Sequence, residues 1–150
     1  MIKRIKENDL AKAIELIRAV YYETEYVNDD LEGRKRFEFE FCDDPNIKNR
    51  IRNDELFMYG YYDSALCGVI SIDRDGYIMK LYVDSKKMGQ GIASSLVRYV
   101  IGIARKRKIK VITLDSSVYA KEFYLHHGFK MKNELVVEDG MSYIPMYQEI

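Results

Sequence analysis

The chain has 150 residues, 47% of them hydrophobic and 13% aromatic, so it can bury the core of one ordinary domain without disulfides or metals. This length excludes a second full domain, and we expect residues 1–150 to form a single domain. The 24 Lys and Arg balance the 24 Asp and Glu, which argues against nucleic acid as a partner, because nucleic-acid binders carry a basic excess.

The two cysteines, Cys42 and Cys67, have neither CxxC spacing nor His partners. We expect reduced, buried thiols in a cytoplasmic protein, with a single disulfide as the alternative, and we expect no metal site. The N-terminus lacks the apolar segment of a secretion signal, and the apolar runs are far shorter than the roughly 18 residues of a membrane span. The sequence therefore predicts neither classical export nor a membrane partner.

The predicted elements begin with a short strand, Ile2–Ile5, and a helix that ends near Thr24. Asn8 or Asp9 can cap this helix, and its apolar residues recur at helical spacing. Residues 25–52 are charged with scattered Phe and are predicted to form one or two further helices. The apolar positions of the first helix are Leu10, Ile14, Ile17 and Tyr21.

Strand-like runs fill the middle of the chain, before and after one long helix at about Gly91–Arg107. This helix carries its apolar residues on one stripe, which predicts that one face is buried. The strand-like runs are Glu55–Tyr62, Leu66–Asp73, Tyr77–Val83 and Lys110–Asp115, and the helix stripe consists of Ile92, Leu96, Val100 and Ile103.

A shorter helix, Ser117–His126, is predicted to end at Gly128, which suits a left-handed C-terminal cap. Two final strands, Phe129–Val137 and Ser142–Gln148, meet at Asp139-Gly140, a strong hairpin signal. The order of elements predicts an α/β domain in which antiparallel strands precede one parallel strand–helix–strand unit.

Gly89 and Gly91 lie between the third predicted strand and the long helix. Glycines let backbone N–H groups approach a ligand, and the helix N-terminus adds unpaired donors, so the loop suits phosphate, although two glycines also permit a plain tight turn. From Lys80 to Lys110 there are nine Lys or Arg against Asp84 alone. This block predicts a footprint for a multiply phosphorylated ligand.

Two other phosphate-binding loops fit less well. A Rossmann site would use Asp115 as its ribose ligand, but Ser94 replaces its third glycine and five residues separate the strand from the first glycine. A Walker loop is excluded, because no Gly-Lys-Ser/Thr follows the glycines.

Two motifs follow one another in this region. After the strand segment Leu81–Val83 comes Met88-Gly-Gln-Gly-Ile-Ala, and further on comes Ser117-Val-Tyr-Ala-Lys-Glu-Phe-Tyr124, followed by Gly128-Phe129. Both resemble motifs of the GNAT superfamily of acetyl-CoA-dependent N-acetyltransferases: the Arg/Gln-x-x-Gly-x-Gly/Ala pyrophosphate loop and Asn-x-x-Ala-x-x-x-Tyr followed by Gly-Phe. The resemblance covers residues 76–130; Met88 replaces the usual Arg or Gln, and Ser117 the common Asn.

The resemblance implies a GNAT-like mixed, mostly antiparallel sheet of about six to seven strands, with helices on both faces and strands that splay at the coenzyme site. It implies acetyl-CoA as co-substrate, no metal, and Tyr124 as the acid for the leaving thiolate, since a phenol pKa near 10 suits that role. The alternative is that Tyr124 only packs in the core. The implied coenzyme-binding residues are Leu81, Val83, Met88, Gly89, Gln90, Gly91, Ile92, Ala93, Ser94 and Ser117.

Residues 23–44 contain nine Asp or Glu against three Lys or Arg. The resemblance implies that this region forms a wall of the acceptor pocket, where acidic and aromatic side chains attract a cationic amine. A solvated pair of helices is the alternative. The aromatic residues are Tyr21, Tyr22, Tyr26, Phe37, Phe39 and Phe41.

No residue stands out as the general base, and water can serve instead. Adjacent histidines point about 100° apart on a helix, so His126 and His127 cannot chelate one metal together, and we expect them to form a solvated helix end. The candidate bases are Asp115, Glu25, Glu40, Tyr77 and Tyr82.

The sequence thus predicts direct transfer of an acetyl group from acetyl-CoA to a primary amine in a ternary complex. The acceptor is expected to be a small cationic molecule, with a protein lysine or N-terminus as an alternative. A non-catalytic CoA-binding or regulatory domain is the competing hypothesis, and the protein is expected to be a monomer or homodimer.

Overall fold

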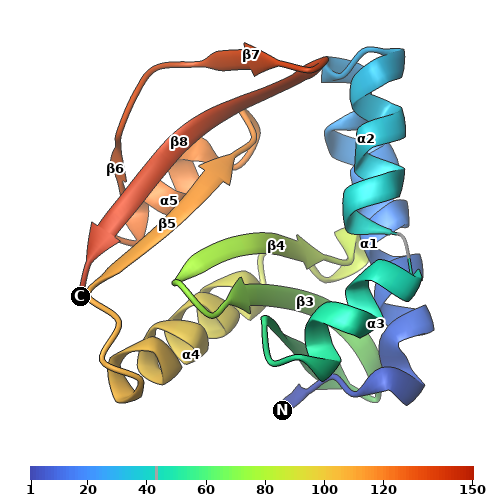
Figure 1. Ribbon diagram of the computed structural model, residues 1–150, viewed down its shortest axis with the longest axis vertical. Coiled ribbons are helices and arrows are strands. Elements are labelled where there is room, and N and C mark those ends of the chain that lie inside the picture. The colour runs from blue at the N-terminus through green and yellow to red at the C-terminus, as the bar shows by residue number, and fades with distance from the viewer. Residues whose placement is uncertain (43) are drawn as a thin grey trace.

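The computed structural model describes residues 1–42 and 44–150, and it contains an eight-stranded sheet with helices on both faces (Figure 1). The strand order is β1-β2-β3-β4-β5-β8-β6, with β7 paired to β8 off this path. Among the strand pairs of the described residues, only β4 and β5 are parallel. The strands are β1 (Ile2–Arg4), β2 (Leu56–Asp63), β3 (Ala65–Asp73), β4 (Tyr77–Val83), β5 (Val111–Ser116), β6 (Lys130–Met131), β7 (Val136–Glu138) and β8 (Met141–Glu149), and the α-helices are α1 (Leu10–Thr24), α2 (Leu31–Phe41), α3 (Asp44–Arg52), α4 (Ile92–Lys106) and α5 (Lys121–His126).

This architecture confirms the predicted mixed, mostly antiparallel sheet, with one strand more than expected. The extra strand arises because the segment predicted as one strand, Phe129–Val137, is divided into β6 and β7. Residues 132–135 separate the two, three of them polar, and the backbone N–H of Glu134 donates to the Asn133 side chain at 2.9 Å. This local hydrogen bond replaces a sheet partner, so the chain leaves the sheet between β6 and β7.

The helix predicted over Ser117–His126 is shorter in the structure than its sequence pattern indicates. It begins at Lys121 rather than Ser117, because residues 117–120 form a turn in which the Ala120 N–H donates to the Ser117 hydroxyl oxygen at 3.0 Å. Gly128 after this helix has φ +87°, which confirms the left-handed cap. At the other end of the chain, Asp9 makes no side-chain capping bond, because a short 3₁₀ turn leads directly into α1.

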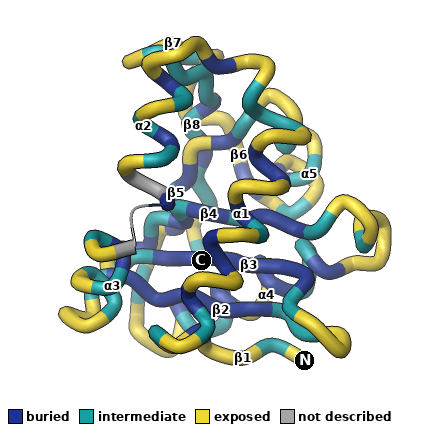
Figure 2. The backbone as a smooth tube through the Cα atoms, turned by 90° about the vertical axis from the view of Figure 1, so that its right-hand side faces the viewer, coloured by how far each residue is buried: buried dark blue, intermediate teal, exposed yellow. Residues whose placement is uncertain are grey.

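One face of the sheet is covered by α1, α2 and α3. The apolar residues of α1 face β2, β3 and β4, as their helical spacing predicts. Figure 2 shows these central strands as mostly buried tube, while the outer turns of the helices are exposed. The buried side chains of this core are Ile5, Leu10, Ala13, Ile14, Ile17, Val20, Tyr21, Phe37, Cys42, Ile47, Leu56, Met58, Val69 and Tyr82.

The opposite face is covered by α4 and α5. The stripe predicted on α4 is buried except for Ile103, which is only half-buried, while Ile101 and Ala104 join the core. Cys42 and Cys67 are free and buried, as predicted. Among the described residues there is no helix that is both long and apolar enough to span a membrane.

The hairpin between β7 and β8 docks on the beginning of α2, and Figure 1 shows this contact at the top of the molecule. Asp139 and Gly140 both have positive φ, which confirms the predicted turn. The Gly140 carbonyl accepts from the Asp30 N–H at 3.2 Å, and Arg36 pairs with Asp139 at 3.0 Å. Asp30 also caps α2 by accepting from the Gly33 N–H at 3.0 Å, so one residue joins the helix and the hairpin.

We predict that Gly33→Ala detaches this hairpin. A Cβ at Gly33 would clash with the Gly140 carbonyl oxygen, which is backbone and cannot move aside cheaply. The expected loss is about 1–3 kcal/mol of unfolding free energy, measured by urea denaturation. Gly102→Ala is the matched control, because a Cβ there meets nothing within 4 Å; equal stability of the two variants would contradict the prediction.

Candidate active site

The parallel strands β4 and β5 separate shortly after they meet. They pair only at Tyr77 with Thr113 and at Ile78 with Leu114. At that point the register of β4 against β3 shifts between Ile78 and Lys80, which leaves Met79 as a β-bulge. Within the described residues no strand pairs with the β5-facing edge of β4 beyond Ile78, and two adjoining cavities occupy this fork.

The first cavity, which we call the loop cavity, has a volume of about 580 Å³. It lies between the end of β4, the glycine loop and the beginnings of α4 and α5. Of the predicted coenzyme-binding residues, Gln90 alone is missing from its lining. The lining residues are Val20, Thr24, Glu25, Leu81, Tyr82, Val83, Lys87, Met88, Gly89, Gly91, Ile92, Ala93, Ser94, Ser117, Tyr119, Ala120, Phe123 and Tyr124.

The glycine loop is shaped for close approach of a ligand. Gly89 and Gly91 have φ +79° and +80°, and a Cβ at either position would meet nothing within 4 Å. The glycines are therefore required by the backbone conformation and leave the space above the loop open. Gly91 is the N-cap of α4 and supplies no side-chain cap, so the first-turn N–H groups lack a side-chain partner from the N-cap, and unpaired donors at a helix N-terminus suit an anion.

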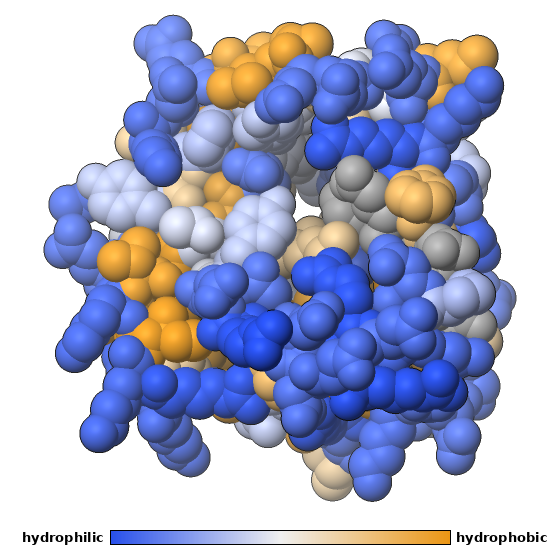
Figure 3. Space-filling view, viewed as in Figure 1, coloured by the Kyte–Doolittle hydropathy of each residue, from blue (hydrophilic) through white to orange (hydrophobic). Residues whose placement is uncertain are grey.

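The second cavity, which we call the acidic cavity, has a volume of about 240 Å³. It is lined by three carboxylates, Glu25, Asp29 and Asp115, by two basic side chains, Arg36 and Lys80, and by tyrosines of β4 and β8. A hollow is visible near the middle of the face drawn in Figure 3, between the β5–β8 half and the β3–β4 half. The residues that line both cavities are Glu25, Leu81, Tyr82, Ser117, Ala120 and Tyr124.

Glu25 lies where the two cavities meet. It follows the last residue of α1, and the Tyr82 hydroxyl donates to its carboxylate at 3.5 Å. Burial, and secondly the charge of Asp29, raise the pKa of Glu25 to about 7. Asp29 itself is buried and accepts from the Tyr21 hydroxyl at 2.6 Å. Glu25 can therefore exchange a proton near neutral pH, the property that a general base needs.

Tyr124 is buried and reaches both cavities from α5. Its ring packs edge to face on Phe123 and Phe129, with centroids 5.2 and 5.6 Å away. Burial, and secondly the charge of Glu25, raise the pKa of Tyr124, so the phenol keeps its proton. Burial likewise raises the pKa of Tyr82 well above 10, which excludes Tyr82 as a base at neutral pH.

Of the remaining candidate bases, Asp115 and Tyr77 do not lie where the two cavities meet, in contrast to Glu25. Asp115 is exposed and accepts from the Tyr77 hydroxyl at 3.0 Å, so these two candidates are bonded to each other at the far end of the acidic cavity. The side chain of Glu40 lies outside the described residues, as do those of Phe41, Asp43 and Asp44 from the predicted acidic wall.

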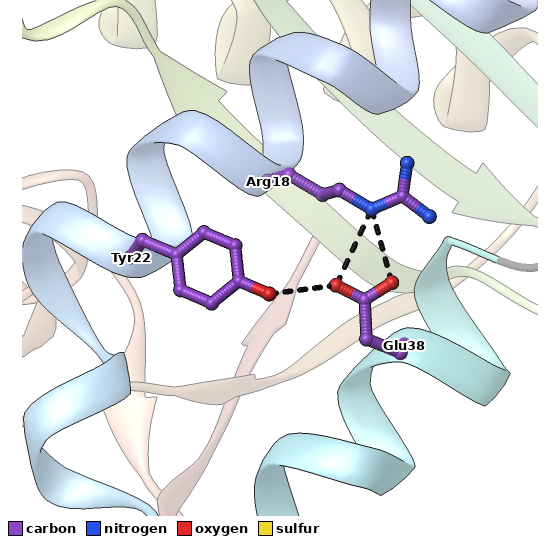
Figure 4. Close-up of polar contacts among 3 residues, drawn as sticks. All are labelled: Arg18, Tyr22 and Glu38. Atoms are coloured by element: carbon purple, nitrogen blue, oxygen red, sulfur yellow. Dashed lines mark hydrogen bonds and ion pairs between the residues drawn. The ribbon is translucent and has the colours of Figure 1, made fainter.

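Residues 23–44 contribute only part of the predicted acidic and aromatic wall: Glu25, Asn28, Asp29 and Arg36 line the acidic cavity. Glu38 is bound by Arg18 at 3.0 Å and by the Tyr22 hydroxyl at 3.0 Å, which ties α2 to α1 (Figure 4). Tyr21 and Phe37 stack at 3.6 Å inside the core. From the described acids of this segment only Glu25 and Asp29 line the acidic cavity, since helical geometry turns the remaining side chains toward solvent or neighbouring helices.

Most of the basic residues predicted to contact a phosphorylated ligand lie away from the glycine loop. Arg105, Lys106 and the residues after them lie at the C-terminal end of α4, about 22 Å from its N-terminus at 1.5 Å per residue. There they complement the helix dipole rather than a ligand at the glycine loop. Lys80 is buried on β4, where burial and secondly Arg50 lower its pKa to about 7. Lys87 lines the loop cavity and pairs with Asp63 at 3.4 Å.

The prediction of a solvated pair of histidines holds only for His126. The His127 ring is half-buried, and its Nε2 lies 2.8 Å from the Ser94 hydroxyl of α4. Sequence reasoning missed this contact because Ser94 and His127 are far apart in the chain. No group of three or more potential metal ligands occurs in the described part of the chain.

Comparison with protein families identifies one matching model, which describes an acetyltransferase (GNAT) domain and covers residues 18–150. The match includes both cavities and extends well beyond the two motifs found in the sequence.

Solved structures share the fold of this chain. The PaiA N-acetyltransferase from Thermoplasma acidophilum, in complex with coenzyme A, has a TM-score of 0.83 at 21% identity, over 100% of this chain and 98% of that one. A GCN5-related N-acetyltransferase from Rhodopseudomonas palustris has a TM-score of 0.80 at 19% identity, over 100% and 95%. A GNAT-family acetyltransferase from Staphylococcus aureus Mu50 has a TM-score of 0.76 at 17% identity, over 99% and 98%.

We predict that Glu25→Gln stabilises the ligand-free protein at high pH. The ordinary glutamate pKa of 4.5 becomes about 7 on folding, so between these values the folded state holds a proton that the unfolded chain has released. Stability therefore falls as pH rises through this window, by at most about 3 kcal/mol. Urea denaturation should show Glu25→Gln roughly 2–3 kcal/mol above wild type at pH 8 and little difference near pH 4.5.

Glu23→Gln is the matched control, since Glu23 is exposed two residues earlier. The expected result is the same stability as wild type at both pH values. A pH-independent effect of Glu25→Gln would show that its carboxyl titrates as in the unfolded chain.

Proposed function

The chain belongs to the GNAT acetyltransferase family, and from that membership we propose that it transfers an acetyl group from acetyl-CoA to the primary amine of a small cationic acceptor. The observation that carries this proposal is the junction of the two cavities at Glu25, Tyr82 and Tyr124. A proton acceptor and a proton donor thus stand where a donor substrate and an acceptor substrate would meet.

The loop cavity fits the coenzyme. The open space over Gly89 and Gly91 and the uncapped start of α4 suit a pyrophosphate. The backbone of Leu81 and Val83 borders the fork, so the pantetheine arm can lie beside β4 as an added strand. A similar fold has been solved in complex with coenzyme A, which supports the same use here.

The acidic cavity fits a small amine. Its volume of about 240 Å³ lies just below the range of about 300–1,000 Å³ for ligand pockets, which suits a small amine, and the docked hairpin contributes Met141 and Tyr143 to its wall. The three carboxylates of this cavity outnumber its two basic side chains, Arg36 and Lys80, so the cavity favours an ammonium group. The small size of this cavity favours a free small molecule over a protein segment as the acceptor.

Glu25 accepts a proton from the bound ammonium group, and the neutral amine then attacks the thioester carbonyl. As the carbon–sulfur bond breaks, Tyr124 donates its hydroxyl proton to the sulfur. The proton that the nitrogen loses on becoming an amide restores the Tyr124 phenol, directly or through water. Glu25 releases the proton that it took from the ammonium group to solvent, so the products are an acetamide, the free thiol and one proton. A wild-type kcat/KM in Glu25→Gln, or a pH profile without a limb near 7, would contradict the role of Glu25.

The decisive experiment measures thiol release from acetyl-CoA with a panel of mono- and polyamines, amino sugars and lysine peptides. Turnover with a small cationic amine supports the proposal, and turnover only with peptides supports a protein acceptor. Tight binding of acetyl-CoA by calorimetry without turnover on the whole panel would favour a non-catalytic coenzyme-binding domain.

We predict that Gly89→Ala weakens acetyl-CoA binding at least about tenfold, because the Cβ enters the space over the loop and disfavours φ +79°. The accompanying loss of stability should be only about 1–2 kcal/mol. Calorimetric titration of the folded variant measures the affinity, with Gly102→Ala as control. Wild-type affinity in Gly89→Ala would remove the phosphate role from this loop.

We predict that Tyr124→Phe lowers kcat by about 10²–10⁴, the usual contribution of a general acid, while KM for acetyl-CoA changes only a few-fold. The ring and its packing on Phe129 are retained, so folding should be unaffected. The decrease in kcat should be smaller with an acyl donor whose thiol is more acidic, because the sulfur of that leaving group needs less help from a proton. A variant with wild-type kcat would leave Tyr124 as a packing residue only.

A further inference from the structure

His127 forms a direct bridge between the two helices that wall the loop cavity. Its Nε2 lies 2.8 Å from the Ser94 hydroxyl, and its Nδ1 lies 2.8 Å from the Phe123 carbonyl oxygen. Ser94 belongs to the first turn of α4, while Phe123 is one turn before His127 on α5. Both Ser94 and Phe123 line the loop cavity.

The hydrogen-bond partners define the direction of each bond. A carbonyl oxygen only accepts, so Nδ1 of His127 must carry the hydrogen in the bond to Phe123. In the neutral ring Nε2 is then the acceptor, and the Ser94 hydroxyl donates to it. The ring also lies 4.3 Å from the Phe123 ring, tilted by 30°. Three contacts therefore hold the imidazole in one orientation.

The bridge engages a serine that would otherwise face the ligand. The next residue, Ser95, donates its hydroxyl to the Gly91 carbonyl at 2.9 Å. With both serine hydroxyls occupied by protein acceptors, the donors left for an anion on this turn are backbone N–H groups. Ser94 therefore serves α5 through His127 rather than the phosphate.

The bridge matters because α5 is short and carries Tyr124. A helix of six residues has few internal hydrogen bonds and takes its position from tertiary contacts. Tyr124 lies three residues before His127, one turn away on the same helix. The bridge thus connects the turn that would hold the pyrophosphate with the residue that would protonate the sulfur.

We propose that His127 is a positioning residue: by binding Ser94, it sets the distance of Tyr124 from the start of α4, and so aligns the phenol with the sulfur of a coenzyme anchored there. This inference rests on the proposed function, because it requires Tyr124 to act on the coenzyme sulfur. The phosphate contacts themselves do not depend on the bridge, since they are made by backbone.

The test uses a pair of amide substitutions. Gln at position 127 places its amide oxygen near the position of Nε2 and can still accept from Ser94, whereas Asn reaches only the position of Nδ1. We expect His127→Asn to lower kcat about tenfold, as a small misplacement of a catalytic group does, with KM for acetyl-CoA within about threefold of wild type. His127→Gln should recover most of the loss.

His126→Asn is the matched control, because His126 is the exposed neighbour on the same helix end, and it should have wild-type kinetics. Ser94→Ala removes the donor of the same bond and should reproduce the loss. The double variant Ser94→Ala, His127→Asn should be no slower than either single variant, since both remove one interaction. If His127→Asn fails to fold, Ser94→Ala carries the test alone.

The His127→Asn substitution, made in the Tyr124→Phe variant, tells whether His127 positions the Tyr124 hydroxyl or only supports the fold. There, His127→Asn should lower kcat by less than about twofold, because the hydroxyl that the bridge positions is already absent. A further tenfold loss in that background, or a loss confined to KM, would overturn the inference and leave the proposed function intact. Wild-type kcat in Tyr124→Phe itself would instead refute the acid and, with it, the positioning role.

Discussion

The separation of β4 from β5 is the constraint on which the rest of this site depends. Two strands that pair at only two positions leave the edge of β4 without a strand partner, and a buried backbone edge needs hydrogen-bond partners of some kind. The β-bulge at Met79 occurs where the separation begins and turns the side chains of the following residues. The fork therefore provides both a place for an extended ligand arm and a path from one cavity to the other. The helices α1 and α5 deliver Glu25 and Tyr124 to this path from opposite faces of the sheet.

The chemistry of the junction opposes the stability of the fold. A carboxyl at Glu25 is largely removed from water and stands near a second buried carboxylate, Asp29, which raises its pKa into the range where it can exchange a proton. The same burial raises the pKa of Tyr124 and keeps its phenol protonated. Two hydrophobic cores, one on each face of the sheet, compensate for these unfavourable polar groups. Perturbed ionisation of this kind, inside a cavity, is typical of functional sites.

Several local contacts hold the walls of the two cavities in place. The Asp30 cap joins α2 to the β7–β8 hairpin, the Glu38 carboxylate joins α2 to α1, and the His127 imidazole joins α5 to α4. Each links segments that are distant in the sequence. Exposed ion pairs such as Arg18–Glu38 contribute little stability, typically below about 1 kcal/mol. Their importance here is geometric, because they fix the separation of elements that carry cavity-lining residues.

By itself, the sequence determined the class of the fold, most element boundaries and the glycine loop. These depend on local periodicity, on glycine conformation and on motif spacing, all of which can be read over short stretches of chain. Only the tertiary structure decided which of the acidic residues reach the cavity, that Lys80 is buried, and that His127 binds Ser94. The family resemblance and the composition of residues 23–44 suggested an acidic and aromatic wall, yet a helix distributes its side chains around the axis, and only those facing the fork can meet a ligand. Glu25 was one of five candidate bases in the sequence, and it became distinct only through its burial and its place between the cavities, which are properties of the packed chain and not of any segment of it.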